Sequence, residues 1–540
     1  MVLGLAACGD KAEEPAASSK ADTAEEAAPA AEKTADEAAP AAEADSAAPS
    51  AGYIADELNV GNNGSTVFIG SFDVSNYYSN GITVGSARLI YDSLFFVNNG
   101  KMDSRIFSEW SYSDDTTLVC QLKDNVTFSD GDPMTCEDIL WSLGLYKQGY
   151  WGSNLEKLDV ENSYYEGNTL YLKWFEAFAP GLNRLATQVM NKSFVEALIA
   201  EKGGQDNVDW FDLSVQCGSG PYVCVEQVTD SYAVFQLRED YWGLEEYGAP
   251  AKTINCYLYK DQTTMAIEFE QGKLDICYNI ANTDAERAQN GEIEDCCLGL
   301  AYANTMITYV FSSIEPEFQD LNVRLAFAHA LETDAITEMA YGVYGIPTTG
   351  MMSENMPYYK SGLVYEYDPD LSRELLATAG ADGLSFTFSC MNVTQFSSMA
   401  ESTQYYEDAV GIHMELNILD PFACIDLGKG GGQALWMNNE CDGSSYEPSN
   451  MFAKYQAGLA PDMFRLDDTA MMEKIDAGVS TLDDEGRREI YEWLQQYEYD
   501  NCICVPICDY AGGYLYRPSV MDDPYTPAVN TPDLLMITMK

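Results

Sequence analysis

The chain has 540 residues, of which 46% are apolar, and it carries 86 acidic against 29 basic side chains for a formal net charge of −57. A chain of this length exceeds one hydrophobic core, so two or more lobes are expected. So negative a charge excludes nucleic-acid binding, which needs basic side chains against phosphates. No apolar run reaches the roughly 18 residues of a membrane span, so any membrane attachment is expected to come from an anchor.

The chain begins with residues 1–8, MVLGLAAC, in which small and apolar residues lead to a cysteine. Leu5-Ala6-Ala7-Cys8 resembles the lipobox of bacterial lipoproteins, which implies that Cys8 is lipidated and becomes the mature N-terminus. An export signal has a basic segment and then about 7–15 apolar residues, whereas seven uncharged residues precede Cys8. We therefore expect a translation start assigned too far downstream, or a shortened chain. The alternative is an ordinary apolar start with a chance cysteine.

Residues 9–52 are an acidic segment rich in Ala, Glu, Pro and Ser. Between residues 11 and 50 there is no aromatic and no branched aliphatic side chain, so this stretch cannot bury enough surface to fold. Repeated prolines argue against one long helix, and like charges extend the chain. The sequence therefore predicts a disordered linker that tethers a folded body to a lipid anchor.

The folded body shows a strand, a turn and a capped helix within residues 116–143. Alternating Leu118, Cys120 and Leu122 predict a strand, and the residues 130–133, DGDP, predict a turn. Thr135 with an Asp three residues later is typical of a capping box that opens a helix. We therefore expect a strand–turn–helix unit here.

Five further motifs follow in chain order. They are Gly218-Ser219-Gly220-Pro221-Tyr222, the strand 235–243 ending in Tyr-Trp-Gly, the helix and glycine cap at 267–275, the helix 320–331 with Val-Arg-x-Ala, and Asp368-Pro369 opening a helix that closes on Gly380. Asp at the N-cap, Pro at the first position and Gly past the end are expected helix boundaries. Together the six motifs cover most of residues 58–518 and resemble the family 5 extracellular solute-binding proteins, the oligopeptide and dipeptide receptors.

The resemblance implies an α/β protein with a two-lobed periplasmic-binding-protein-like fold (type II, large cluster C type), with an extra subdomain and a disordered tether before it. By analogy, lobe I comprises 53–303 and 501–540, with a subdomain at about 95–213, and lobe II comprises 304–500. The chain would cross between the lobes near 308–311 and near 505–509. Closure of two lobes around a ligand is a common two-state switch.

The same resemblance implies a binding protein and not an enzyme. It is expected to capture an oligopeptide or dipeptide and deliver it to the permease and ATPase of an ABC transporter, as a monomer without a cofactor. Its expected place is the outer face of the cytoplasmic membrane, lipid-anchored, in the periplasmic or extracellular space. Two alternatives stay open: the same fold with a non-peptide solute (an oligosaccharide, an opine or a metal chelate), or a sensory or adhesive lipoprotein without transport.

Candidate ligand-binding residues come from the same family analogy. In the peptide receptors a Trp-containing segment of the second lobe ends in an acidic residue and Pro, and an Asp three residues earlier meets the peptide's α-amino group. If Glu447-Pro448 is the match, Ser444 takes that position, and a serine offers only a neutral hydrogen bond. Asp442 would replace it after a shift of the loop, or is a solvated loop residue. The candidates are Tyr77, Tyr78, Trp436, Asn438, Asn439, Asp442, Ser444 and Tyr446.

The fifteen cysteines leave an even number once Cys8 is set aside, which would permit disulfides outside the cytoplasm, although spacing identifies no partners. Alternation in the run NCICVPIC puts Cys502 and Cys504 on one face of a strand and favours small core residues over metal ligands. The two histidines, His329 and His413, argue against a His-based zinc site or a Ser-His-Asp triad. No metal site or catalytic motif is predicted.

Overall fold

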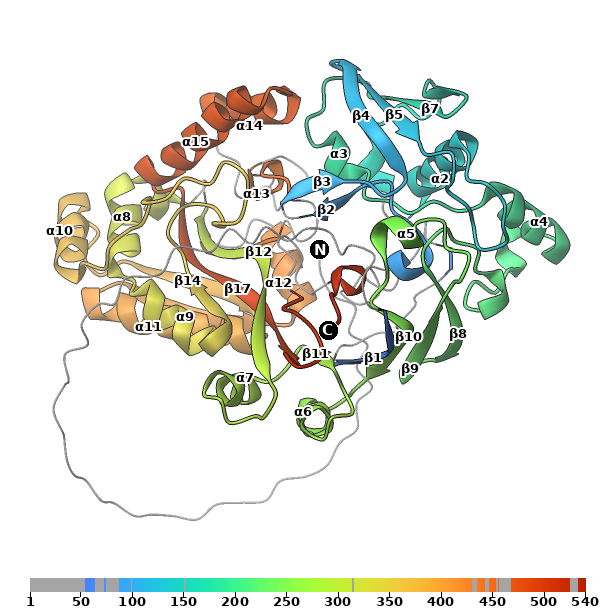
Figure 1. Cartoon of the computed structure of the whole chain (residues 1–540). Helices are drawn as coiled ribbons and strands as arrows, with labels where there is room; N and C mark the ends of the chain where they lie inside the picture. Colours follow the sequence, from blue (N-terminus) through green and yellow to red (C-terminus); the bar gives the residue numbers. More distant parts are fainter. Residues whose placement is uncertain are drawn as a thin grey trace. The chain divides into compact units, whose positions relative to one another are not determined.

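The structure is a computed structural model that describes residues 54–63, 72–73, 87–98, 100–149, 152–312, 315–429, 435–441, 446–452, 455, 468–524 and 533–540. The chain divides into two units, residues 1–47 and 48–540, and every described residue belongs to the second. Cys8 and the predicted linker 9–52 therefore lie outside the described residues. Figure 1 shows the elements coloured along the sequence.

One sheet extends through the described part of the molecule. Its strands are β1 (Ala55–Asn62), β8 (Tyr222–Val228), β9 (Tyr232–Leu237), β10 (Ala251–Leu258), β11 (Ile276–Tyr278), β12 (Cys297–Phe311), β13 (Gly345–Pro347), β14 (Ser385–Met391), β15 (His413–Leu419), β16 (Leu435–Cys441) and β17 (Cys504–Tyr516). Among the described residues the order is β15-β14-β16-β12-β17-β11-β1-β10-β9-β8, with β13 also paired to β17. The sheet is mixed, because β1 runs parallel to β10 and β11 whereas β12 and β17 are antiparallel.

Smaller sheets and several helices accompany the N-terminal half of this sheet. The strands β4 (Phe107–Asp114), β5 (Thr117–Leu122), β6 (Tyr164–Glu166) and β7 (Thr169–Lys173) pair in the order β4-β5-β7-β6, and β2 (Phe96–Asn98) pairs with β3 (Lys101–Asp103). The helices here are α2 (Cys136–Gln148), α3 (Gly181–Arg184), α4 (Lys192–Lys202), α5 (Leu244–Tyr247), α6 (Gln262–Glu270) and α7 (Asn282–Gln289).

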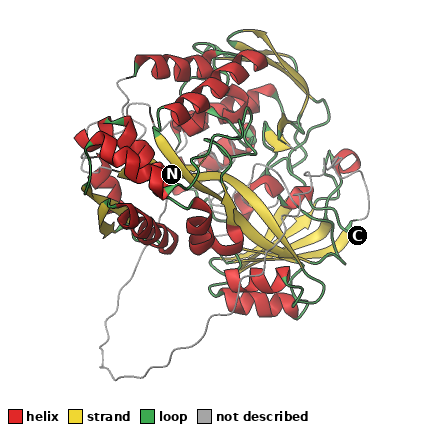
Figure 2. Ribbon diagram, turned by 90° about the vertical axis from the view of Figure 1, so that its left-hand side faces the viewer, coloured by secondary structure: helices red, strands yellow, loops and turns green. Residues whose placement is uncertain are grey.

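Further helices belong to the C-terminal half. They are α8 (Leu321–Ala330), α9 (Thr333–Tyr341), α10 (Pro369–Ala379), α11 (Thr394–Val410), α12 (Pro421–Lys429), α13 (Ser449–Phe452), α14 (Thr469–Ser480) and α15 (Asp484–Asp500). Of these, α11 and α12 contact β14 while α13 contacts β16. Figure 2 shows long strands that run between groups of helices. No helix in the part of the chain that the structure describes is long and apolar enough to cross a membrane.

Two large hydrophobic cores share the strands β12 and β17. Ala301 and Tyr514 belong to the first core, whereas Met306 and Cys508 belong to the second. The change from one core to the other therefore falls within 301–306 on β12 and within 508–514 on β17. The register of the two strands shifts between Tyr302 and Met306, so the ladder is irregular at this crossing. The lobe boundaries themselves remain a prediction.

Local sequence signals are confirmed at three helix ends. The hydroxyl of Thr135 accepts a hydrogen bond from the amide of Asp138 at 3.3 Å, and the carboxylate of Asp138 accepts one from the amide of Thr135 at 2.9 Å. Asp368 caps α10 by accepting from the amide of Leu371 at 2.9 Å. Gly380 ends that helix with a φ of 66°, a conformation that glycine adopts without strain.

Most of the described cysteines are buried core residues, as expected from the sequence. The prediction that Cys502 lies on one strand with Cys504 is wrong. Cys502, Cys504 and Cys508 are buried in the second core, which confirms the core interpretation. Cys502, however, has a φ of 42° and precedes β17, so it does not alternate with Cys504 along one strand. A strand needs negative φ, and the turn after α15 sets the opposite sign here. Thirteen cysteines have described side chains, and eleven of these are buried.

Candidate functional site

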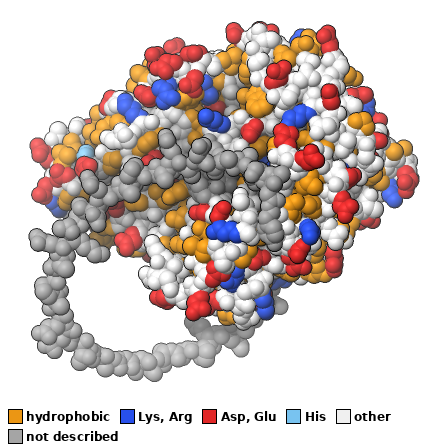
Figure 3. All heavy atoms as spheres, in the orientation of Figure 1, with side chains coloured by type: hydrophobic (Ala, Val, Ile, Leu, Met, Phe, Trp, Pro, Cys, Tyr) orange, Lys and Arg blue, Asp and Glu red, His pale blue; other side chains and the backbone are white. Residues whose placement is uncertain are grey.

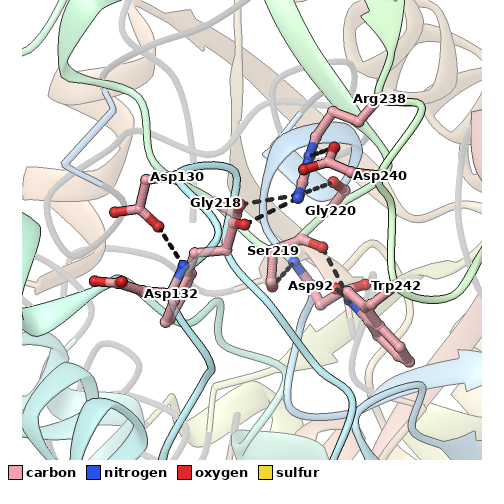
Figure 4. Close-up of polar contacts among 10 residues, drawn as sticks. Asp92, Asp130, Asp132, Gly218, Ser219, Gly220, Arg238, Asp240 and Trp242 are labelled. Atoms are coloured by element: carbon pink, nitrogen blue, oxygen red, sulfur yellow. Dashed lines mark hydrogen bonds and ion pairs between the residues drawn. The ribbon is translucent and has the colours of Figure 1, made fainter.

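The sequence motifs of the first lobe converge on the buried guanidinium of Arg238. Its Nη1 donates to the carbonyl oxygens of Gly218 at 3.3 Å and Gly220 at 3.0 Å, and its Nη2 donates to that of Phe128 at 2.9 Å. Figure 4 shows Arg238 between the two glycines, with the exposed carboxylate of Asp240 beside it. A single side chain thus ties the turn at 128–131 to the glycine-rich turn at 218–222.

Ser219 and Trp242 join the loop at Asp92 to the same cluster. The indole Nε1 of Trp242 donates to the carboxylate of Asp92 at 3.2 Å and to the carbonyl of Ser219 at 3.0 Å (Figure 4). A Cβ built on Gly218 would lie 1.9 Å from the carbonyl oxygen of Ile90, so the close approach of the two segments requires glycine. Burial raises the pKa of Asp92, and the nearby Arg105 opposes that shift. These motifs hold the backbone segments of the scaffold together.

The predicted ligand-binding segment begins on β16. The backbones of Trp436, Asn438 and Asn439 pair with β12 opposite Val310, Thr308 and Ile307. The segment is therefore attached to one of the two strands that pass between the cores. The side chains of Trp436, Asn438 and Asn439 lie outside the described residues, as do Tyr77, Tyr78, Asp442 and Ser444.

Tyr446 is the one predicted ligand-binding residue whose side chain falls within the described residues. It has a φ of 50°, a left-handed conformation that is uncommon for a non-glycine residue. Its ring is half-buried at the edge of the second core, and burial raises the pKa of its hydroxyl. Backbone conformations of this kind persist where surrounding contacts enforce them, and they are frequent at functional sites.

The residue after Tyr446 forms a buried ion pair that sequence reasoning did not anticipate. Arg487 Nη2 donates to Glu447 Oε1 at 2.5 Å, and the two side chains are 11% and 1% exposed. The same carboxylate oxygen accepts from the amide of Ser449 at 3.0 Å, at the start of α13. Glu447-Pro448 was identified as a motif, but nothing in its spacing points to a partner 40 residues later on α15.

No group of three or more His, Cys, Asp or Glu side chains in the described residues could hold a metal ion. A cavity of about 10 Å³ lies in the second core beside Tyr365 and Pro506, which is room for roughly one water molecule and too small for a peptide. Acidic side chains are scattered over the face in Figure 3 and not gathered into one patch.

Two α/β lobes on one mixed sheet, joined by a pair of long strands, define the class of periplasmic solute-binding proteins. The chain belongs to the bacterial extracellular solute-binding proteins, family 5, whose model for the middle region matches residues 102–462. Family membership and the two-lobed α/β fold confirm the fold class expected from the sequence. The chain is accordingly a solute-binding protein that serves an ABC transporter.

Three known proteins illustrate the range of relatives. The nickel-binding periplasmic protein of Escherichia coli is 23% identical over 470 residues, which are 81% of this chain and 87% of that protein. The glutathione-binding protein GsiB of the same organism is 24% identical over 349 residues, 62% of this chain and 64% of its own. The periplasmic binding protein DppA from Helicobacter pylori, solved in complex with the peptide STSA, superposes with a TM-score of 0.67 at 16% identity, over 90% of this chain and 98% of that one.

Proposed function

We propose that the protein captures a peptide, an oligopeptide or a dipeptide, between two lobes and delivers it to the permease and ATPase of an ABC transporter. The lobes are residues 53–303 with 501–540, and residues 304–500, and the protein acts as a monomeric binding protein without catalytic turnover. The observation that carries the proposal is the pair β12–β17, which runs from the first core into the second. An irregular ladder at the crossing is a suitable place for the lobes to bend.

The ligand site is proposed at the segment that begins on β16. Tyr446, Trp436, Tyr77 and Tyr78 would supply aromatic walls, because Tyr and Trp rings contact apolar groups while their polar atoms bind polar ones. Asn438 and Asn439 would orient a peptide through their amide groups, and Asp442 or Ser444 would meet its amino terminus.

A metal chelate is the second candidate solute. The nickel-binding periplasmic protein of Escherichia coli aligns over 81% of this chain, whereas the glutathione-binding protein GsiB aligns over 62%. Ser444 also stands where a peptide receptor has Asp, which weakens the electrostatic case for a free ammonium group.

A thermal-shift screen of peptide, oligosaccharide and metal-chelate pools tests the ligand class. A solute that binds only the folded protein stabilises it by RT ln(1 + [L]/Kd), about 2.7 kcal/mol at a hundredfold excess over Kd. The peptide pool is expected to raise the midpoint, and N-acetylation of the peptides should remove the shift if Asp442 binds the ammonium group. Stabilisation by the chelate pool alone selects the second candidate. Hydrolysis of a bound peptide would overturn the proposal.

Anchoring at Cys8 is proposed with the linker 9–52 as the tether, which puts the protein on the outer face of the cytoplasmic membrane. Expression from an upstream start, followed by mass spectrometry of the N-terminal peptide, is expected to find a diacylated Cys8. Replacement of Cys8 by Ser should release the protein from the membrane fraction. Membrane attachment that survives this replacement would contradict the lipoprotein assignment.

A further inference from the structure

Elements other than β12 and β17 also connect the two cores. The amide of Ala179 donates to the carbonyl of Val479 at 2.8 Å, which joins the segment before α3 to α14. Arg184 Nη2, on α3, donates to Asn450 Oδ1 on α13 at 2.7 Å. Val479 is part of α14 yet packs against the first hydrophobic core. Figure 1 shows α14 and α3 facing each other.

A third contact lies at the turn between β2 and β3. Gly100 has a φ of 71°, and a Cβ built on it would lie 2.8 Å from the hydroxyl oxygen of Tyr446. The tyrosine ring therefore occupies the space that a side chain at Gly100 would need. This contact brings the candidate ligand residue Tyr446 against the first-lobe side of the molecule.

One arginine organises the second-lobe partners of these contacts. Arg487 Nε donates to the carbonyl of Gly478 at 3.3 Å, next to Val479, and its Nη2 binds Glu447, next to Tyr446. Its guanidinium also lies over the rings of Tyr358 and Tyr491, 5.6 and 5.4 Å from their centroids. These two rings stack on each other with their centroids 5.7 Å apart, so the guanidinium lies beside a fixed aromatic pair. A planar group that contacts this pair and donates in two directions fixes the relative position of the residues it binds.

Hydrogen bonds of Glu447 also fix the position of Asn450. Its Oε1 accepts from the amide of Ser449, and the amide of Asn450 donates to the carbonyl of Glu447 at 3.1 Å. Asn450, whose side chain accepts from Arg184, is thus held by the turn 447–450, and the Glu447–Arg487 ion pair fixes that turn. Arg487 binds Glu447 and Gly478. The three second-lobe contact residues, which are Tyr446, Asn450 and Val479, all lie within three positions of one of these two.

We propose that these three contacts form a latch that holds the lobes closed, and that Arg487 is the positioning residue of the latch. The inference rests on the proposed function, in which closure retains the solute. The apparent affinity of a binding protein falls with the fraction of molecules in the binding-competent state, so a weaker latch lowers affinity without a change in the solute site. A hydrogen bond from a charged group contributes enough to shift the open–closed equilibrium about tenfold.

The first test replaces the two half-buried partners Arg184 and Asn450 of the latch. Arg184→Gln and Asn450→Ala remove the same hydrogen bond from its two sides, and Arg373→Gln is the matched control, because that arginine loses a charge at an exposed pair within α10. Small-angle X-ray scattering without added solute is expected to show a larger radius of gyration than the parent for both latch variants. The control should have the same radius of gyration as the parent. The double variant should have nearly the same radius of gyration as either single variant, because both changes remove the same hydrogen bond.

A second pair of variants tests Tyr446 without a change of charge. Gly100→Ala and Gly131→Ala both introduce a Cβ at positive φ, but the Gly131 site has no atom within 4 Å. Both should lower the thermal midpoint, and only Gly100→Ala should also enlarge the radius of gyration. For Arg487→Lys, which retains the charge but not the two-directional donors, we expect faster hydrogen exchange at the amide of Ala179.

The outcomes separate the latch from the proposed function. Solute affinity, measured with the stabilising pool, should fall about tenfold in Arg184→Gln and stay unchanged in Arg373→Gln. If a pool binds but scattering and affinity are equal in these two variants, the latch is wrong and the solute-binding function stands. If scattering responds but no pool binds, the latch holds and the solute proposal fails. If Arg487→Lys lowers only the thermal midpoint, its role is structural and the positioning role is overturned.

Discussion

Glu447 and Arg487, 40 positions apart in the sequence, form an ion pair with an N–O distance of 2.5 Å inside the second lobe. The carboxylate is 1% exposed, so water does not screen the pair. It links the end of the predicted ligand-binding segment to α15, and through Gly478 to the end of α14.

Glu447→Gln should therefore destabilise the protein strongly. The change leaves the charge of Arg487 buried without a counter-charge, which costs about 3–5 kcal/mol of unfolding free energy. Urea unfolding of the parent and the variant measures this loss of unfolding free energy. Asp370→Asn is the control, because Asp370 pairs with Arg373 on the surface and is 94% exposed, so its loss should cost under about 1 kcal/mol. Equal effects for the two variants would show that Glu447 contributes no more than a surface charge.

Glu407 makes stability depend on pH. This carboxyl is fully buried on α11, and neither oxygen has a hydrogen-bond partner among the described residues. Burial raises its pKa well above the ordinary value of 4.5. Above pH 4.5 the unfolded chain has released this proton while the folded protein still binds it. The free energy of unfolding attributable to Glu407 therefore falls as pH rises from 4.5 toward the folded-state pKa.

Replacement of Glu407 by Gln should remove this dependence. The variant is expected to lose less stability than the parent between pH 5 and pH 8 in urea unfolding. Glu407→Met, which also removes the unpartnered polar atoms, should gain about 1–3 kcal/mol at neutral pH. Exposed Glu401 lies on the same helix, and Glu401→Gln should leave the profile unchanged. A parent and a Glu407→Gln variant with identical profiles would rule out a raised pKa.

Arg238 is predicted to be the stability centre of the first-lobe motifs. Arg238→Met would remove three hydrogen bonds. The carbonyls of Phe128 and Gly218 would keep the amide donors of Gly131 and Ser129, whereas that of Gly220 would lose the donor that Arg238 supplies. The expected cost is about 2–5 kcal/mol. Asp240→Asn removes only the exposed ion pair of this arginine and should change unfolding by under about 1 kcal/mol. Denaturant unfolding of the two variants distinguishes carbonyl binding from charge pairing as the role of Arg238.

The eleven buried cysteines should be unreactive in the folded protein. The thiolate is the reactive form, and burial raises the pKa of the thiols of Cys296, Cys502 and Cys508 to about 12. Alkylation at pH 8 with peptide mapping is expected to modify the eleven buried cysteines only after unfolding, and the half-buried Cys296 and Cys297 before the others. Rapid modification of Cys256 in the native protein would contradict the burial.

The sequence alone determined the family and most of the local structure. The capping box at Thr135, the helix that Asp368 opens and Gly380 closes, and the order of six motifs depend on neighbours within a few residues, so their signals are readable without a fold. The glycine-rich turn at 218–220 was recognised for the same reason, although what its glycines avoid, the backbone at Ile90, lies far away in the chain.

Only the tertiary structure decided which distant residues meet. Glu447 had no signal that pointed to Arg487, and neither Arg184 nor Gly100 carried any pattern that placed it against Asn450 or Tyr446. Cys502 fitted a strand by alternation, yet the turn after α15 gave it a positive φ. Contacts of this kind depend on how two cores pack around shared strands. In a chain with 86 carboxylates, composition does not reveal which few are buried and paired.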